Sequence, residues 1–189
     1  MSTGKRAKRV LIVVLAVALL TAVIPFAAHR ARQALYPQKY EDCVRIYAQE
    51  YEIDEKYIYA IIRTESGFDP KAESDAGARG LMQITRETFE WIKTKIAPDE
   101  QIGFDSLYDP ETNIRFGSYF LSFCLERYDG DLSTAAAAYH SGVSKVNELL
   151  KQSEYSSDGR TLHTFPYSQM SNYVRKVQKN YEQYCALYS

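Results

Sequence analysis

The chain has 189 residues, and its charged residues are unevenly distributed along it. Six of its 23 Lys and Arg residues precede Tyr36, whereas all 24 Asp and Glu residues follow it, which leaves 17 − 24 = −7 formal charges on the remainder. An acidic domain without a basic patch argues against nucleic acid as a partner. The length suits one globular domain with an accessory segment, and such a domain needs no metal or disulfide to build its core.

The N-terminus predicts a membrane anchor. Residues 1–9 form a basic tail, and the following nineteen residues, 10–28, carry no charge. A helix of that length is about long enough to cross a bilayer at ~1.5 Å per residue. Because basic flanks stay in the cytoplasm, we expect a single-pass protein of the cell membrane with the rest of the chain on the extracytoplasmic side. An uncleaved anchor is favoured over a cleaved signal peptide, since Phe26 is bulky for a cleavage site.

The rest of the chain predicts a short linker over 29–37 and a single all-α domain over 38–189, without a convincing strand pattern. The helix that begins at Asp109-Pro110 is expected to be the central core element, because an N-cap followed by proline is a typical helix start. The helices expected in chain order cover about 38–51, 54–66, a stretch after Thr85, 109–130, 132–139, 144–152 and 170–188.

The three cysteines do not have the spacing of a metal site. A bridge between Cys43 and Cys185 would join the two ends of the domain, and three separate buried thiols, including Cys124, are the other possibility. We expect no metal and no cofactor.

Glu65 ends a predicted helix and shares its apolar face. Ile58, Ile61 and Ile62 lie seven, four and three positions before it, which places all four side chains on one side of the helix. Burial disfavours a charged carboxylate, and the negative end of the helix dipole acts in the same direction. The pattern predicts a raised pKa and a general acid near neutral pH. The alternative is an ordinary exposed glutamate at a frayed helix end.

Several motifs around Glu65 resemble those of one family. They are Glu65-Ser66-Gly67-Phe68-Asp69-Pro70, Gly80-Leu81-Met82-Gln83, Ala138-Tyr139-His140-Ser141-Gly142, and Phe165-Pro166-Tyr167 with Asn172-Tyr173-Val174. In this order they resemble the signature of the soluble-lytic-transglycosylase-like (SLT domain) family, relatives of goose-type lysozyme. The resemblance extends over about 51–177, which is most of the outer domain.

The resemblance implies a mostly helical fold of the lysozyme-like α+β superfamily and a bacterial enzyme of cell-wall remodelling. The substrate would be the peptidoglycan glycan strand, cleaved at the β-1,4 bond between N-acetylmuramic acid and N-acetylglucosamine. A single glutamate, matching Glu65, would act as acid and then as base, while the 6-hydroxyl of the muramic acid attacks its own anomeric carbon. A 1,6-anhydro end results, and neither a second carboxylate nor a cofactor is required.

The same motifs suggest which residues contact the sugar. Tyrosines offer an apolar face and a hydroxyl, and Gln83 carries an amide that suits an acetamido group. Each of two residues has an alternative to a sugar contact. Met82 could simply fill the core, and Ser66 could be a polar residue at the C-terminal end of a helix. The substrate-binding residues expected from the motifs are Ser66, Met82, Gln83, Tyr139, His140 and Tyr173.

Two departures from the family pattern affect this site. His140 stands where the family usually has Asn, and Gln169-Met170-Ser171 stands where Glu-Thr-Arg is usual. We expect His140 to keep a substrate contact, although it could also add a pH-dependent charge near Glu65 or be a structural histidine. The loss of the acid at Gln169 affects binding and rate more than the type of reaction.

Two other functions remain open. One is a hydrolytic muramidase in which Asp69, Asp75 or Asp109 positions a water molecule, and carboxyl separations would decide it. The other is a catalytically weak domain that binds glycan strands or recruits partners, since a fold can persist without its activity.

Overall fold

The structure, a computed structural model, describes residues 3–188, with the exception of the side chains of residues 3–7 and 9–18. The chain divides into two compact units, Met1–Pro37 and Gln38–Ser189.

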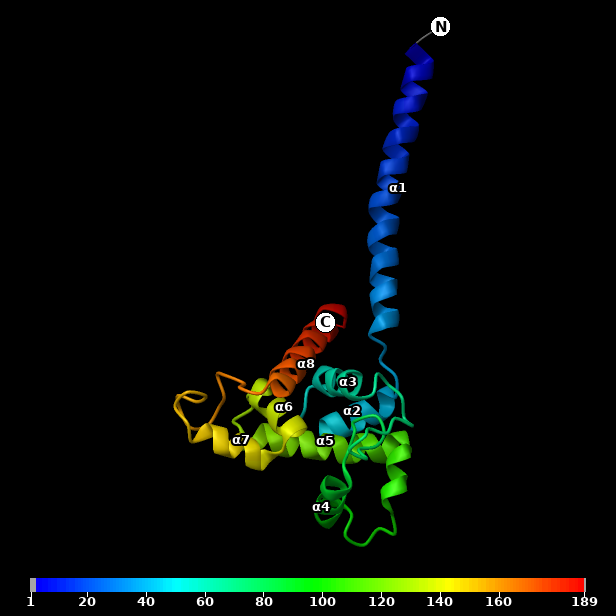
Figure 1. Ribbon diagram of the computed structural model, residues 1–189. Helices are drawn as coiled ribbons and strands as arrows, with labels where there is room; N and C mark the ends of the chain where they lie inside the picture. Colours follow the sequence, from blue (N-terminus) through cyan, green and yellow to red (C-terminus); the bar gives the residue numbers. More distant parts are fainter. Residues whose placement is uncertain (1–2, 189) are drawn as a thin grey trace. The chain divides into compact units, whose positions relative to one another are not determined.

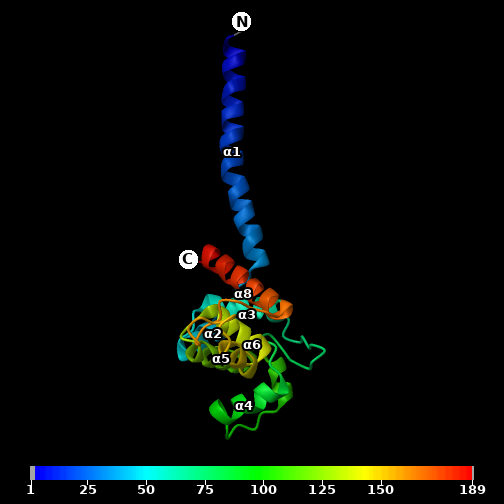
Figure 2. The ribbon, with the colours of Figure 1, turned by 60° about the vertical axis from the view of Figure 1, so that its left-hand side comes forward.

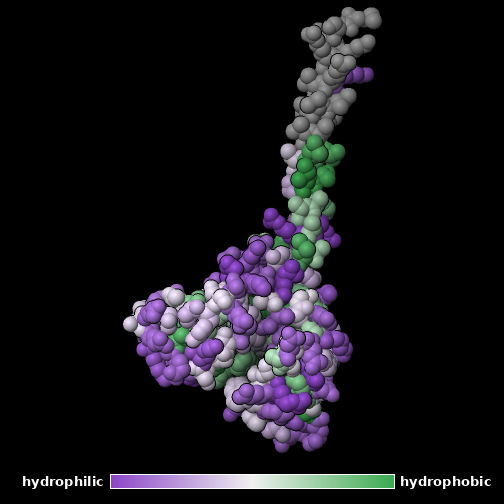
Figure 3. Space-filling model, viewed as in Figure 1, coloured by the Kyte–Doolittle hydropathy of each residue, from purple (hydrophilic) through white to green (hydrophobic). Residues whose placement is uncertain are grey.

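The first unit contains one helix, α1 (Thr3–Leu35; Figure 1). Residues 29–35 of the expected linker continue this helix, because no Gly or Pro interrupts them. The expected membrane segment lies within α1, but the side chains of residues 10–18 fall outside the described part, as do most of those of the basic tail 1–9. Within the described part, no helix combines the length and apolar content that a membrane crossing needs. The exposed apolar side chains of α1 include Leu19, Leu20, Val23, Ile24 and Phe26, and they are coloured green in Figure 3.

The second unit is helical, which confirms the expected class, and the residues described there contain no named strand. Figures 1 and 2 show its elements from two sides. They are α2 (Glu41–Glu50), α3 (Glu55–Glu65), α4 (Arg86–Ile96), the short 3-10 helix η1 (Phe104–Tyr108), α5 (Pro110–Arg127), α6 (Leu132–Ser141), α7 (Val143–Leu150) and α8 (Ser168–Leu187).

Side-chain caps fix three helix starts as the sequence predicts. Asp54, Thr85 and Asp109 each accept a hydrogen bond from a backbone N–H in the first turn of α3, α4 and α5. The first helix of the domain begins at Glu41, later than the expected start at about 38, because Tyr40 has φ 61° and lies before α2. The element η1 was not predicted, since a five-residue 3-10 turn has no distinct sequence period.

Two groups of helices make the core. Helix α5 contacts α2, α4, α6 and η1, which agrees with its expected central place, and α8 packs against α3 and α6. Buried aromatic pairs tie these groups internally: the rings of Phe89 and Phe116 stack at 5.2 Å and those of Tyr59 and Tyr184 at 5.4 Å. The C-terminal end of α3 therefore meets α8, and this contact positions Glu65.

No disulfide joins the cysteines within residues 3–188. Cys124 is buried in α5, whereas Cys43 and Cys185 are half-buried. The structure therefore matches neither expectation: the described residues contain no bridge between Cys43 and Cys185, and only one of the three thiols is fully buried. Burial raises the pKa of the Cys124 thiol to about 12, so this thiol behaves as a core side chain.

Candidate active site

Glu65 lines an open cavity of about 490 Å³ whose walls come from three helices. The last turn of α3 supplies Glu65 and its neighbour, α6 supplies one residue from its C-terminal end, and α8 supplies the remaining side. The residues that line the cavity are Thr64, Glu65, His140, Gln169, Asn172, Tyr173 and Lys176.

The Glu65 carboxyl is held in a partly desolvated position. Its Oε1 accepts a 2.6 Å hydrogen bond from the Tyr173 hydroxyl, a short distance of the kind found with charged acceptors. Although the residue as a whole is half-exposed to the cavity, burial of its carboxyl raises the pKa of Glu65 to about 7, against the lowering effect of the Tyr173 hydrogen bond. Near neutral pH this carboxyl can therefore both give and accept a proton.

His140 covers the tyrosine that contacts Glu65. The imidazole ring stacks on the Tyr173 ring at a centroid distance of 4.3 Å and an interplanar angle of 11°. Although the residue as a whole is exposed, stacking on Tyr173 partly buries the imidazole ring, and this burial lowers the pKa of His140. The two predicted residues thus meet beside Glu65, with Tyr173 buried and His140 exposed.

Ser66 connects the end of α3 to the Gly80-Leu81-Met82-Gln83 segment. Its hydroxyl donates to the Leu81 carbonyl at 2.8 Å, with the Ile62 carbonyl at 3.2 Å, and accepts from the Phe68 backbone N–H at 3.2 Å. Because these bonds use the only proton of the hydroxyl, Ser66 positions backbone in this structure rather than donating a hydrogen bond to a sugar.

Met82 and Tyr139, both expected to contact the sugar, are buried. The Met82 side chain has no exposed surface and packs on Gly117, where an added Cβ would lie 2.4 Å from the Met82 sulfur. The Tyr139 hydroxyl donates to the Met82 carbonyl at 2.9 Å. A direct sugar contact by the Met82 side chain does not fit this geometry, because the close approach of α5 at glycine leaves the thioether inside the core.

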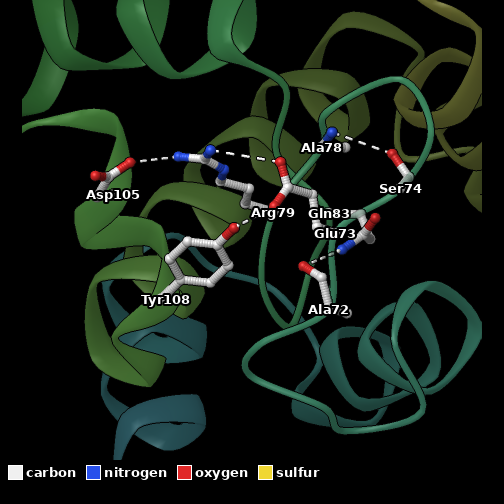
Figure 4. Close-up of polar contacts among 8 residues, drawn as sticks. All are labelled: Ala72, Glu73, Ser74, Ala78, Arg79, Gln83, Asp105 and Tyr108. Atoms are coloured by element: carbon white, nitrogen blue, oxygen red, sulfur yellow. Dashed lines mark hydrogen bonds and ion pairs between the residues drawn. The ribbon is translucent and has the colours of Figure 1, made fainter.

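Gln83 closes the loop that follows α3. It has φ 51°, and its amide donates to the carbonyls of Ala72 and Gly80 at 3.2 and 3.0 Å (Figure 4). Figure 4 also shows the Arg79 guanidinium between Glu73 and Asp105. These contacts hold the loop between α3 and α4 in one shape, and the half-buried Gln83 keeps its amide oxygen available.

Asn113 is a site-supporting residue that the motifs do not include. Its side chain is fully buried on α5, accepts from the Met82 backbone N–H at 2.7 Å, and donates to the carbonyls of Arg79 and Leu107 at 2.9 and 2.8 Å. Gly80 has φ +75°, and a Cβ there would lie 2.1 Å from the Asn113 amide nitrogen. Only glycine fits both conditions. Asn113 shares one face of α5 with Phe116, Gly117 and Phe120, and a polar residue on this apolar face was the available signal.

Two cavity residues, Thr64 and Lys176, were also missed by the motifs. The Thr64 hydroxyl donates to the Ala60 carbonyl at 2.7 Å and accepts from the Asn180 amide at 2.9 Å, so it fixes α8 against α3. Lys176 lies three positions after Tyr173, and helical spacing from that predicted residue could have identified it.

The carboxylates considered for water activation lie elsewhere. Asp69, Asp75 and Asp109 are exposed and do not line the Glu65 cavity, and two of them serve backbone N–H groups: Asp69 that of Lys71, and Asp109 that of Thr112. Within the described residues, Glu65 is the only acidic side chain lining this cavity, and no cluster of His, Cys, Asp or Glu has an arrangement suited to a metal ion.

Residues 42–161 match the family model described as the transglycosylase SLT domain. The chain belongs to this family. The matched range accounts for more than half of the chain and includes Thr64, Glu65 and His140, whereas the cavity residues of α8 follow it.

Relatives of this SLT domain include enzymes with both soluble and membrane-bound names. The chain is 33% identical over 144 residues to the soluble lytic murein transglycosylase of Salmonella typhimurium, covering 75% of this chain and 22% of that protein. It is 32% identical over 170 residues to the membrane-bound lytic murein transglycosylase C of Yersinia pestis, covering 77% of this chain and 47% of that protein.

Solved structures agree with the fold. The 70 kDa soluble lytic transglycosylase of Escherichia coli superposes with a TM-score of 0.73 at 28% identity, covering 82% of this chain and 25% of that one. An inactive mutant of the lytic transglycosylase Slt of Pseudomonas aeruginosa gives a TM-score of 0.70 at 28% identity, covering 80% and 25%. The chain thus spans about a quarter of the length of its soluble relatives.

Proposed function

We propose that the chain is a peptidoglycan lytic transglycosylase in which Glu65 is the only acid and base. The observation that carries the proposal is a partly desolvated carboxyl with a pKa of about 7 in a cavity whose lining, among the residues that the structure describes, contains no second carboxylate. Hydrolysis by the usual pair of carboxylates would need another acid within several ångströms. The names of the two relatives described above, both lytic murein transglycosylases, support the same reaction.

The proposed reaction has two steps. Protonated Glu65 donates its proton to the bridging oxygen as the bond to the anomeric carbon of N-acetylmuramic acid breaks, which releases N-acetylglucosamine with a free 4-hydroxyl. The 6-hydroxyl of the muramic acid then bonds to that carbon and gives its proton to the Glu65 carboxylate. No water is consumed, and the intramolecular nucleophile has a high effective concentration.

Neighbouring residues would support this carboxyl in both states. The Tyr173 hydroxyl donates to it when it is ionised, and the bond fixes its direction. His140 holds the Tyr173 ring and is exposed on the cavity side, where a sugar contact remains open to it. In this account Ser66, Met82 and Tyr139 position the backbone near Glu65, and Gln83 presents an amide to the acetamido group.

Cleavage in ¹⁸O-labelled water tests the reaction type. A transglycosylase yields anhydromuramic ends without the label, because the new bond comes from the substrate's own hydroxyl. A muramidase yields reducing ends that each carry one labelled oxygen. Absence of cleavage, with retained binding to the wall, would favour the third reading of a glycan-binding domain.

We further propose that α1 anchors the enzyme in the cytoplasmic membrane, so that the SLT domain acts on the extracytoplasmic side. The uncharged sequence of residues 10–28, the exposed apolar side chains from Leu19 to Phe26, and the membrane-bound name of one relative support this. Fractionation tests it: the full chain should remain in the membrane pellet at high salt and leave it only with detergent.

A further inference from the structure

Arg79 connects the segment that carries Gln83 to the short helix η1. Its backbone N–H donates to the Ile84 carbonyl at 3.0 Å and its carbonyl accepts from the Ile84 N–H at 3.1 Å, so the two bonds close the segment between them into a turn. Its guanidinium pairs with Asp105 of η1 and, at 3.4 Å, with Glu73 of the loop (Figure 4). These contacts of the Arg79 side chain are called here the Arg79 clamp.

The guanidinium of the Arg79 clamp has a single, well-defined position. The Arg79 side chain is only 18% exposed, and its guanidinium lies 4.4 Å from the centroid of the Phe104 ring and 5.0 Å from that of Tyr108. The Tyr108 hydroxyl donates to Oε2 of Glu73 at 2.6 Å. An exposed ion pair contributes little, but a guanidinium that stacks on two rings and pairs with two carboxylates is fixed in direction. The clamp therefore sets the position of the loop on η1.

Stability alone does not account for an arginine at this place. Its Nε atom is buried and has no hydrogen-bond partner among the described residues, which costs free energy. An apolar side chain between the same rings would avoid this cost. The turn also has a second support, because the buried Asn113 amide donates to the Arg79 carbonyl at 2.9 Å. The specific contribution of the Arg79 side chain is thus the position of the loop.

The direction of the Gln83 side chain depends on this position. Its amide donates to the carbonyls of Ala72 and Gly80, and the Gly80 N–H donates to the same Ala72 carbonyl at 2.9 Å. Ala72 directly precedes Glu73, and Gly80 directly follows Arg79, so each carbonyl is next to a residue of the clamp. A shift of either strand of the loop would redirect the amide oxygen of Gln83.

We propose that Arg79 is a positioning residue for substrate binding, which holds the Gln83 amide in place for the acetamido group of the glycan. The inference rests on the proposed function, in which Gln83 presents its amide to that group. Burial and the Tyr173 hydrogen bond shift the pKa of Glu65, and Arg79 is not among the causes. The Arg79 clamp therefore acts on binding and leaves proton transfer by Glu65 unchanged.

Steady-state cleavage of glycan strands of one defined length by the full chain tests the proposal. Arg79→Met keeps a long side chain between the Phe104 and Tyr108 rings but loses the ion pairs. It should raise KM roughly three- to tenfold, as the loss of one hydrogen bond to substrate does, and leave kcat within about twofold. The alkaline limb of kcat should stay at a pH of about 7. Asp105→Asn, a change at a side chain that is 88% exposed, should raise KM in the same direction by less.

Two further variants separate positioning from a general structural effect. Arg115→Met is the matched control, since Arg115 pairs with Glu100 at 2.8 Å, is 25% exposed and lies outside the loop and the cavity. It should leave KM unchanged. Gln83→Ala should raise KM about as much as Arg79→Met, and the two changes together should raise it no further, because both remove the same contact.

An unchanged KM in Arg79→Met, a fall in kcat without a rise in KM, or additive increases in the double variant would overturn the proposal. Circular dichroism of the same samples controls for folding. Failure of the proposed reaction is a separate result, because reducing-end products from the parent would contradict that reaction while the comparison of KM values still reports binding.

Discussion

The Tyr173 hydroxyl donates a 2.6 Å hydrogen bond to Glu65 across 108 positions of sequence. This bond links α8 to the end of α3 at the cavity, and it opposes the effect of burial on the carboxyl. The balance of the two effects gives Glu65 a pKa of about 7 rather than a higher one.

Replacement of this tyrosine should change the pH profile of the enzyme. Tyr173→Phe removes a hydrogen bond that favours the ionised carboxylate, so the pKa of Glu65 should rise and the alkaline limb of kcat should move to higher pH. The measurement is kcat against pH for both proteins. Tyr181→Phe, which removes a hydroxyl bonded to Asp54 away from the cavity, should leave the limb in place. An unmoved limb in Tyr173→Phe would contradict the assignment.

The parent enzyme should lose activity as the pH rises through about 7. The first step needs the protonated form of Glu65, and this form disappears above its pKa. Because burial lowers the pKa of His140, protonation of this ring should affect only the acid side of the profile. His140→Asn should therefore alter the acid limb and leave the alkaline limb where it is.

Glu65 should lower the free energy of unfolding at high pH. Its pKa is about 7 in the folded protein against an ordinary value of 4.5, so between these values the folded state holds more protons than the unfolded state. The folded state therefore favours the protonated carboxyl of Glu65. The stability that goes with this protonated form is fully present below about pH 4.5 and is lost as the pH rises through about 7. Since the side chain is partly exposed, we expect Glu65→Gln to gain about 1–2 kcal/mol at about pH 8 relative to about pH 4.5.

Chemical denaturation of both proteins at the two pH values measures this difference. Glu55→Gln provides a control, because Glu55 lies in the first turn of the same helix, away from the cavity. If the two proteins keep a constant difference across the pH range, the carboxyl of Glu65 is not desolvated in the folded state.

Asn113 should be important for stability and activity together. Asn113→Ala removes the partners of one backbone N–H and two carbonyls inside the core, which should reduce the free energy of unfolding by about 2–4 kcal/mol. Asn113→Asp keeps the acceptor for Met82 but loses the donors to Arg79 and Leu107, and it adds a buried charge. Both variants should lower kcat by loosening the Gly80-Leu81-Met82-Gln83 segment, as denaturation and turnover measurements on the same samples would show. Normal stability in Asn113→Ala would rule out this role.

The sequence predicts the parts of the site that depend on local pattern. The isoleucines before Glu65 repeat with the period of a helix, so its burial could be anticipated, and the three side-chain caps follow from short motifs. The role of Asn113 could not be predicted, because its partner Met82 is 31 positions away and meets it only after the loop folds over α5. The burial of Met82 depends in the same way on Gly117.

The cavity itself depends on packing between helices that are distant in sequence. Helical spacing places Gln169, Asn172 and Lys176 on one face of α8, but it does not reveal that this face lies beside the end of α3. Residues 29–35 differ, because here local sequence was sufficient. This segment was expected as a linker, but it contains enough helix-forming residues to extend α1.

The most direct test of the account is the release of anhydromuropeptides from purified peptidoglycan by the full chain and by Glu65→Gln, counted by mass spectrometry. Circular dichroism of both samples controls for folding. The account predicts anhydromuramic products from the parent and a loss of at least about a thousandfold in Glu65→Gln, because acid and base catalysis are lost with one side chain. Equal release by the two folded proteins would contradict the assignment of Glu65 as the catalytic acid and base.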